Sequence, residues 1–225
     1  MSDQFLEIVF SFDTTGSMSP CLQFLRKKLQ ASIGRLFRDV PNLRIGIVAH
    51  GDYEDARYTY VTKQYPLTTA YSKLEEFVQS VKSTNGYDFD ECYEFVLHEV
   101  QKYNWLPGSK RILVMLGDAH PHMPSYCHNT LNLDWKAETK KLVDMGVSVY
   151  AIKCLDHNTK NFWEALAKVG KGKFIELEEL SDISDLVMGI VLSQTGQLEE
   201  YVKELETAGT MTRSVSKLYS SLREV

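Results

Sequence analysis

The sequence lacks several features that mark whole classes of protein. It has only 4 cysteines in 225 residues. They are widely separated and form no CxxC pair, which argues against a disulfide scaffold and favours reduced thiols. No apolar run approaches the roughly 18–20 residues that a membrane span needs, and the first residues lack the basic start and long apolar stretch of a signal peptide. We therefore expect a cytoplasmic protein with no membrane association.

The sequence also has no excess of positive charge and no phosphate-binding loop. Its 25 basic and 30 acidic residues give a formal net charge of −5, and a mildly acidic chain repels nucleic-acid and anionic membrane phosphates. The absence of a GxxxxGK motif excludes nucleotide hydrolysis by a P-loop. With 44% hydrophobic and 24% charged residues, the composition is that of an ordinary globular protein. No nucleic-acid partner is expected.

Segments of strand type and helix type alternate along most of the chain. Apolar runs rich in β-formers predict strands at residues 5–12, 43–49, 111–116, 147–152 and 174–177, and an alternating pattern predicts one at 58–65. Apolar residues at helical spacing predict helices at 19–38, from 72, from 90 to 100, and at 133–145, 160–169 and 181–193. Ser72, in a capping box with Glu75, and Asp90 are the predicted N-caps of the second and third of these helices. The alternation predicts a doubly wound α/β fold with a mostly parallel sheet, helices on both faces, and an antiparallel edge strand at 58–65.

The texture of the chain changes after residue 195. Gln197–Glu206 is a polar helix pattern with a narrow apolar stripe, Thr207–Ser214 is rich in helix breakers, and Lys217–Val225 has the pattern of a frayed helix. We therefore predict one domain at 1–195 and a C-terminal helical extension at 196–225. The extension packs either on the domain or on a partner.

Hard oxygen donors follow the first predicted strand. Asp13, Thr15 and Ser17 are each two residues apart, so an extended loop brings their side chains to one point, and Gly16 allows a sharp bend. In such folds ligands bind beyond the carboxyl ends of the strands. A carboxylate and two hydroxyls suit Mg²⁺, which takes about six oxygens and retains several waters. Mn²⁺ accepts the same donors.

Two further acidic groups follow later elements at the same predicted edge. Asp118 comes directly after the strand at 111–116, and Asp88 stands with Asp90 and Glu91 in the loop before a helix. The alternative for all of these residues is ordinary: aspartate, threonine and serine are also favoured at turns and helix caps. Convergence of three loops on one cation is the prediction that we carry forward, with Asp88 and Asp118 among the ligands.

A second metal hypothesis concerns the long loop at 119–132. His120, His122, Cys127 and His128 are residue types that bind zinc, but their spacing matches no standard zinc pattern. These side chains more simply line a pocket beside the acidic site. Asp52, which follows the second strand at the same edge, fits either a turn or a residue that orients a metal-bound water.

The segment FSFDTTGSMS resembles the DxSxS motif of von Willebrand factor type A (vWA) domains, with Thr15 in place of the first serine. That family builds a metal-ion-dependent adhesion site from this motif and from two further loops. LGDAHPH, with Asp118, is similar to the third element, and TNGYDFDE to the second. Asp88 falls where other members carry a metal-binding threonine, so either Asp88 or Thr84 supplies that ligand. The resemblance covers about residues 4–195.

The resemblance implies a metal-dependent protein–protein interaction module. A partner's Asp or Glu carboxylate would replace a water on the cation, with Tyr53, Tyr87 and Tyr126 as contacts at the rim. Intracellular members act as adaptors or regulatory subunits of larger assemblies, and we expect the same role here, without catalysis.

Two other function classes compete. A Mg²⁺-dependent phosphohydrolase on a similar fold would use Asp13 as nucleophile. Thr15 then stands where such enzymes need a second acid, and a hydroxyl has too high a pKa for that proton transfer. The third class is a structural protein whose metal site has been lost.

Overall fold

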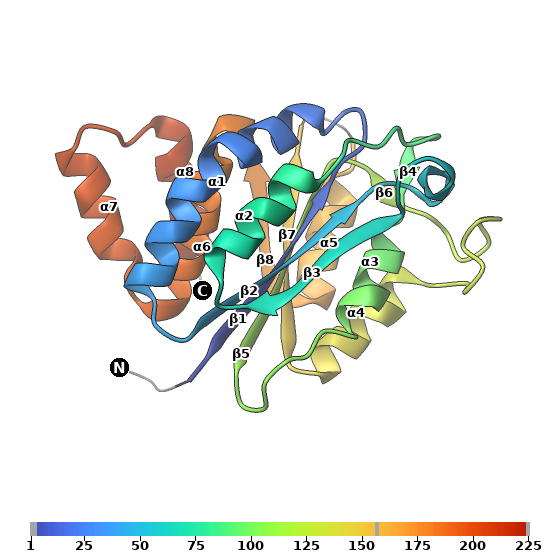
Figure 1. Cartoon of the computed structure of the whole chain (residues 1–225), viewed down its shortest axis with the longest axis horizontal. Helices are drawn as coiled ribbons and strands as arrows, with labels where there is room; N and C mark the ends of the chain where they lie inside the picture. The colour runs from blue at the N-terminus through green and yellow to red at the C-terminus, as the bar shows by residue number, and fades with distance from the viewer. Residues whose placement is uncertain (1–3, 156–157, 224–225) are drawn as a thin grey trace.

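The computed structural model describes residues 4–155 and 158–223 (Figure 1). The strands are β1 (Leu6–Asp13), β2 (Leu43–His50), β3 (Thr62–Thr68), β4 (Asp90–Glu91), β5 (Lys110–Gly117), β6 (His120–Pro121), β7 (Val147–Cys154) and β8 (Lys171–Leu177). The helices are α1 (Ser19–Asp39), α2 (Tyr71–Ser80), α3 (Tyr93–Val100), α4 (Trp135–Asp144), α5 (Lys160–Val169), α6 (Ile183–Thr195), α7 (Leu198–Thr207) and α8 (Arg213–Arg223), with short 3-10 helices η1 (Tyr53–Arg57) and η2 (Leu180–Asp182).

A six-stranded sheet forms the centre of the molecule, in the order β3-β2-β1-β5-β7-β8. β1 pairs in parallel with β2 and β5, and every residue of β1 is buried. Only β3 runs antiparallel, beside β2 at one edge. The predicted fold class is therefore confirmed: a doubly wound, mostly parallel sheet with one antiparallel edge strand.

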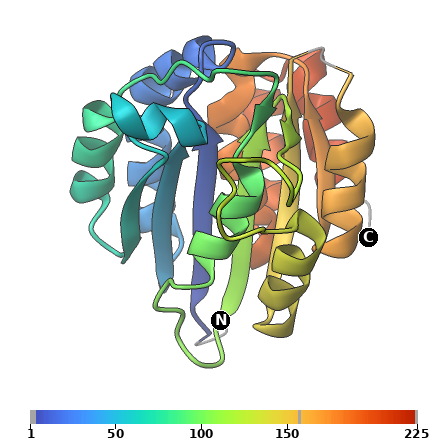
Figure 2. The same cartoon turned by 90° about the vertical axis from the view of Figure 1, so that its right-hand side faces the viewer.

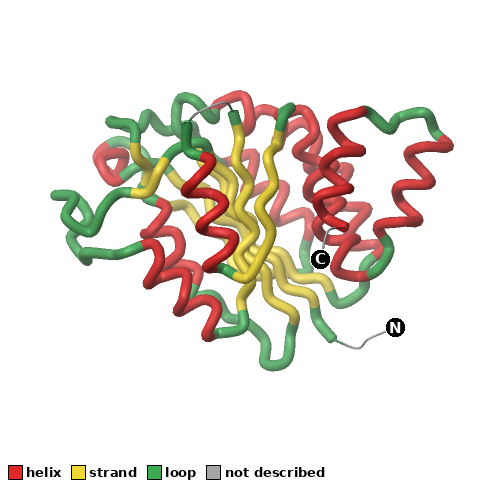
Figure 3. The backbone as a smooth tube through the Cα atoms, turned by 180° about the vertical axis from the view of Figure 1, so that it is seen from behind, coloured by secondary structure: helices red, strands yellow, loops and turns green. Residues whose placement is uncertain are grey.

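Helices cover both faces of this sheet (Figure 3). Residues from α1, α2 and α6 form one hydrophobic cluster against it, and residues from α3, α4 and α5 form another on the opposite face. Apolar side chains of the central strands alternate between the two clusters, because successive strand residues point to opposite faces. Ile8 belongs to the first cluster and Val9 to the second.

Several element boundaries differ from those predicted. The edge strand occupies Thr62–Thr68 rather than 58–65, because residues 53–57 form η1 and Thr62 pairs with His50. Ser72 does not cap α2, whose N-cap is Ala70, and Asp90 lies in β4, two residues before the N-cap of α3 at Cys92. Tertiary pairing at the sheet edge outweighs these local capping preferences.

The C-terminal helices pack on the domain itself. Apolar side chains of α7 and α8 join the cluster that includes α1 and α6. Gly189 of α6 lies so close to α8 that an added Cβ would stand 2.6 Å from the ring of Tyr219. The turn into α7 is made at Gly196, which has a φ of 76°. The extension predicted at 196–225 thus shares a hydrophobic core with the preceding residues, as far as Arg223.

The carboxyl ends of β1, β2 and β5 lie at one edge of the sheet, where the short parallel pair β4–β6 also lies (Figures 1 and 2). We call this edge the mouth of the sheet, and it positions every residue discussed below. None of the helices in the described part of the chain has the length and apolar character to cross a membrane.

Candidate functional site

Asp13 is the buried centre of the mouth. It ends β1 and has no exposed surface. Its Oδ1 accepts hydrogen bonds from the backbone N–H of Thr15 at 2.7 Å and from the Thr15 hydroxyl at 2.6 Å. This local turn explains why the DxT spacing brings Thr15 back to Asp13. Ser17, two residues further on, is exposed at the start of α1.

Tyr93 joins Asp13 to the loop of Asp118. Its hydroxyl donates to Asp13 Oδ2 at 3.0 Å and accepts from the backbone N–H groups of Asp118 and Ala119 at 3.2 and 3.3 Å. Gly117 permits this approach, since a Cβ there would lie 2.2 Å from the Tyr93 oxygen. In the sequence, Tyr93 is only one of the apolar residues of the helix predicted from 90 to 100. The glycine before Asp118 is the sequence signal that a bulky side chain approaches there.

Glu91 is the carboxylate of the second loop that turns inward. It is 5% exposed, and its Oε2 has no hydrogen-bond partner among the residues that the structure describes. Burial, then the charges of Asp13 and Asp52, raise the pKa of Glu91 to about 11. Burial likewise raises the pKa of Asp13 to about 6, against the lowering effect of its bonds from Thr15. The buried carboxylates of Asp13, Asp52 and Glu91 are therefore close enough for their charges to affect one another's pKa.

The imidazole of His50, beside Asp13, carries no positive charge. His50 is paired with Asp13 across β1 and β2 and is fully buried. Burial lowers the pKa of His50 to about 3, so its ring is neutral. Carboxylates and hydroxyls are the donor set that hard divalent cations prefer. The residues of the mouth therefore fit Mg²⁺ or Mn²⁺, and Asp118, 1% exposed, lies among them.

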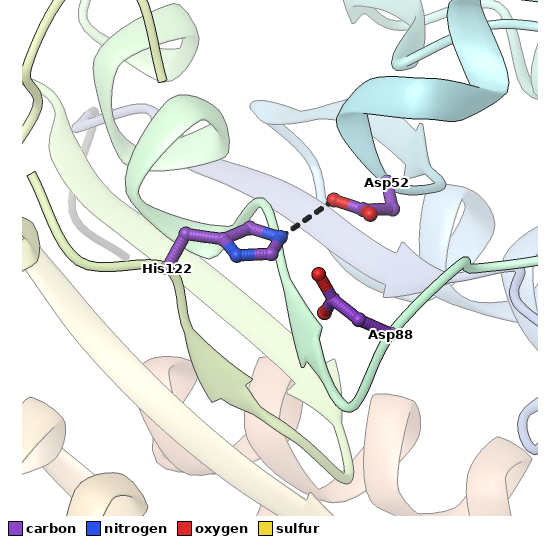
Figure 4. A group of neighbouring side chains, drawn as sticks. All are labelled: Asp52, Asp88 and His122. Atoms are coloured by element: carbon purple, nitrogen blue, oxygen red, sulfur yellow. Dashed lines mark hydrogen bonds and ion pairs between the residues drawn. The ribbon is translucent and has the colours of Figure 1, made fainter. Parts of the chain in front are cut away.

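Asp88 and Thr84, the two alternatives for the second-loop ligand, have different surroundings. Thr84 is buried and its hydroxyl lies 3.1 Å from that of Thr14. Asp88 is exposed and accepts a hydrogen bond from the backbone N–H of Asp90 at 2.8 Å. Its carboxylate faces Asp52 and His122 (Figure 4). Glu91, which sequence reasoning named only as a neighbour, is the acidic side chain of this loop that lies against Asp13.

The histidine-rich loop has a different arrangement from a shared zinc site. His122 is buried, with Nε2 2.7 Å from Asp52 Oδ1. His128 contacts Glu54 at 3.2 Å, and His120 and Cys127 are exposed. Within residues 4–155 and 158–223, the one group of at least three His, Cys, Asp or Glu side chains with ligand atoms all within 4.8 Å is Asp52, Asp88 and His122.

A family model of the von Willebrand factor type A domain matches residues 7–188, which hold nearly all of the elements described above. The chain belongs to the vWA family. The resemblance seen in the sequence is thus confirmed at the level of the family. Domains of this family are commonly protein-interaction modules. Their frequent use of a divalent metal agrees with the donor set at the mouth of this vWA domain.

Relatives of this vWA domain come from unrelated contexts. Alpha-protein kinase vwkA of Dictyostelium discoideum is 24% identical over 124 residues, which are 54% of this chain and 19% of the kinase. The chain thus spans about a fifth of that relative, and kinase activity is a property of the relative. Two solved structures share the fold alone. A vWA domain from Catenulispora acidiphila has a TM-score of 0.64 at 10% identity, covering 84% of this chain and 42% of that one. Proximal thread matrix protein 1 of mussel byssus has a TM-score of 0.63 at 16% identity, covering 84% and 48%.

An apolar rim surrounds the mouth of this vWA domain. Phe89 is 97% exposed and Met123 66%. Tyr87, one of the expected rim tyrosines, is also exposed and lies near the ring of Tyr58. Tyr53 points inward instead, where its hydroxyl donates to Glu94 at 2.7 Å. Phe89, Met123 and Tyr87 are therefore large apolar side chains that solvent reaches in the segments next to β4 and β6.

Proposed function

We propose that this vWA domain is a metal-dependent interaction module that binds an Asp or Glu side chain of a partner protein. The observation that carries the proposal is that two buried carboxylates, Asp13 and Glu91, interact through their charges at the mouth, beside the hydroxyl of Thr15. Asp13, Thr15, Ser17 and Asp118 would hold a Mg²⁺ or Mn²⁺ ion. Glu91 would lie near this ion, because its charge interacts with that of Asp13.

The sequence assignment of Asp88 to this ion stays a prediction. Asp88 is exposed and its carboxylate lies near Asp52 and His122, whereas Asp13 and Asp118 are buried. Glu91 is therefore our first candidate for the second-loop ligand, with Asp88 and Thr84 as the sequence alternatives. Substituting each of the three in turn, and measuring Mg²⁺ affinity, assigns the ligand.

The bound cation would supply positive charge and an exchangeable position for the partner's carboxylate. The residues of the chain supply orientation. Tyr93 holds Asp13 to the Asp118 loop, and the Thr15 turn fixes the Asp13 carboxylate, so the donor atoms are positioned before the ion arrives. Ser17 lies exposed in the turn before α1, where a partner could reach it. A pre-positioned site loses less entropy on binding.

The partner is expected to combine an acidic residue with apolar surface. Phe89 and Met123, which are largely exposed in the segments next to β4 and β6, would contact that surface. We also propose that the domain belongs to a larger assembly in the cytoplasm. Three of its thiols, Cys21, Cys92 and Cys154, are buried and unbridged, as expected in a reducing compartment.

The surroundings of Thr15 support a non-catalytic role. Both its backbone N–H and its hydroxyl donate to Asp13, so this position holds a carboxylate in place and offers no acid for proton transfer. The phosphohydrolase alternative has a simple test. Turnover of a generic phosphate ester with Mg²⁺, lost in Asp13→Ala, would replace the interaction role by catalysis.

The deciding experiment compares wild type, Asp13→Ala and Asp144→Ala. Asp144 is an exposed aspartate of α4, which makes it a matched control for loss of one carboxylate. Mg²⁺ should raise the melting temperature of wild type and Asp144→Ala, but not of Asp13→Ala, because only a ligand that binds the folded state stabilises it. Partner proteins should be captured by wild type and Asp144→Ala and lost with chelator. Equal capture by Asp13→Ala would contradict the proposal.

A Phe89→Ser variant tests the rim separately. Phe89 is almost fully exposed, so its replacement should leave stability and Mg²⁺ binding unchanged while weakening capture of the partner. Unchanged capture would remove the apolar rim from the interface.

A further inference from the structure

We propose that Asp52, Asp88 and His122 form a second cation site, which takes a divalent first-row transition metal of the Zn²⁺ type. It assigns Asp88 to this second ion, so that the Mg²⁺ ion proposed above would take its second-loop ligand from Glu91 or Thr84 and the two sites would share no ligand. Three different segments contribute to it: Asp52 precedes η1, Asp88 precedes β4, and His122 follows β6.

The three side chains point toward one another, as Figure 4 shows. One ligand atom from each lies within 4.8 Å of the other two, and Nε2 of His122 lies 2.7 Å from Oδ1 of Asp52. A cation bound to imidazole nitrogen and carboxylate oxygens at roughly 2.0–2.2 Å needs ligand atoms only slightly further apart than this. Small side-chain adjustments would admit the ion.

A buried acceptor points independently to a ligand. Asp52 has no exposed surface, yet its Oδ2 has no hydrogen-bond partner in the part of the chain that the structure describes. A buried carboxylate oxygen left without a partner is destabilising. A cation beside Asp52 would satisfy Oδ2, whereas the contacts from His122 and from the backbone N–H of Tyr53 both go to Oδ1.

The surrounding contacts hold the site in place. The ring of Tyr126 stacks on that of His122 with centroids 3.8 Å apart and planes 7° apart. The backbone N–H of His122 donates to Glu94 Oε2 at 3.1 Å, and that of Tyr53 donates to Asp52 Oδ1 at 2.6 Å. Two of the three candidate ligands are thus fixed by packing and hydrogen bonds, as metal ligands usually are.

The donor set selects the class of metal. Imidazole nitrogen suits Zn²⁺ and its neighbours in the first transition row, whereas Mg²⁺ prefers oxygen alone. Asp88 is exposed, so the site opens to solvent on its side, and three protein ligands leave a fourth position for water. The alternative is a plain ion pair, in which a proton on His122 balances Asp52 and no metal binds.

Calorimetric titration with Zn²⁺, in saturating Mg²⁺, separates these possibilities. All proteins carry Cys127→Ser, because this exposed thiol would bind Zn²⁺ by itself. His122→Gln and Asp88→Asn remove one ligand each with little change of shape. His120→Gln is the matched control, since His120 is an exposed histidine of the same loop.

We expect one equivalent of Zn²⁺ to bind to the Cys127→Ser protein and to the His120→Gln control. Affinity should fall at least about tenfold in His122→Gln and in Asp88→Asn. Asp13→Ala should keep the Zn²⁺ site even though it loses Mg²⁺ binding. If the Mg²⁺ proposal alone is wrong, Mg²⁺ will not raise the melting temperature of the protein, while Zn²⁺ will still bind.

Three results would overturn the second site. No Zn²⁺ binding by the Cys127→Ser protein would leave an ion pair only. Binding unchanged in both ligand variants would locate the metal elsewhere. Loss of binding in the His120→Gln control, or in Asp13→Ala, would show that the metal uses the histidine loop or the Mg²⁺ site instead.

Discussion

Tyr93→Phe is the substitution that tests the mouth most directly, because it removes one oxygen atom and leaves the packing. The Tyr93 ring is fully buried, stacked at 5.9 Å against Phe162 and edge-on at 5.1 Å to Trp163. Phenylalanine retains these ring contacts. What disappears is the hydroxyl that links Asp13 to the backbone of Asp118 and Ala119.

The magnitude follows from the three bonds of that hydroxyl. A hydrogen bond to a charged group contributes about 1.5–3 kcal/mol and a neutral one about 0.5–1.5 kcal/mol. The bond to Asp13 is 3.0 Å long, while those from Asp118 and Ala119 are 3.2 and 3.3 Å, at the weak end of the range. We expect the free energy of unfolding to fall by about 2–4 kcal/mol. Mg²⁺ affinity should fall about 10–100-fold, as for other residues that orient ligands.

Urea denaturation in EDTA measures the first effect, and calorimetric titration with Mg²⁺ measures the second. Tyr103→Phe is the matched control, since the Tyr103 hydroxyl donates to the carbonyls of Ile47 and Tyr65 inside the sheet. It should lose stability but keep Mg²⁺ affinity. If Tyr93→Phe binds Mg²⁺ like wild type, or if both variants weaken it equally, Tyr93 does not position the site.

Three further predictions concern charge and packing. Burial raises the pKa of Asp13 from 3.8 to about 6, so between these values the folded, metal-free protein binds a proton that the unfolded chain releases. Relative to Asp13→Asn, the unfolding free energy in EDTA should therefore fall by up to about 3 kcal/mol as pH rises through this window; parallel pH profiles would refute this. Burial and neighbouring charges raise the pKa of Glu91 to about 11, so burying this carboxyl group destabilises the metal-free protein at pH 7. Glu91→Gln should therefore raise the unfolding free energy in EDTA at pH 7 by up to about 3 kcal/mol and weaken Mg²⁺ binding. A variant that is less stable than wild type in EDTA would contradict this reasoning. Gly189→Ala places a Cβ 2.6 Å from Tyr219 and should cost about 1–3 kcal/mol by urea denaturation; an unaffected midpoint would mean that α8 is not part of the domain core.

Sequence patterns predicted the strands well where burial on both faces dominates. β1, β5 and β7 are dense apolar runs, and their positions follow from that density. The edge strand β3 was misplaced by about four residues at its start, because an edge strand is only half buried and its pattern is weak. Helix caps failed at Ser72 and Asp90 for a related reason: a favourable capping residue acts only where the chain path makes a helix begin.

The candidate site shows the same division. The DxT spacing determines the turn at Asp13 by itself, since the backbone and hydroxyl of Thr15 reach back over only two residues. The sequence did not show which acidic residue of the second loop turns inward. Asp88, Asp90 and Glu91 differ in burial only because β4 pairs with β6 and turns Glu91 toward Asp13.

The sequence alone therefore determined the fold family, the alternation of strand and helix, and the local oxygen-rich turn after β1, since each depends on residues close together in the chain. The tertiary structure decided what depends on long-range placement. It linked Asp13 to Asp118 through Tyr93, and it separated Asp88 from Glu91. It also packed the final helices onto α6. Contacts between residues tens of positions apart are set by how the sheet brings its loops together, and no local pattern encodes them.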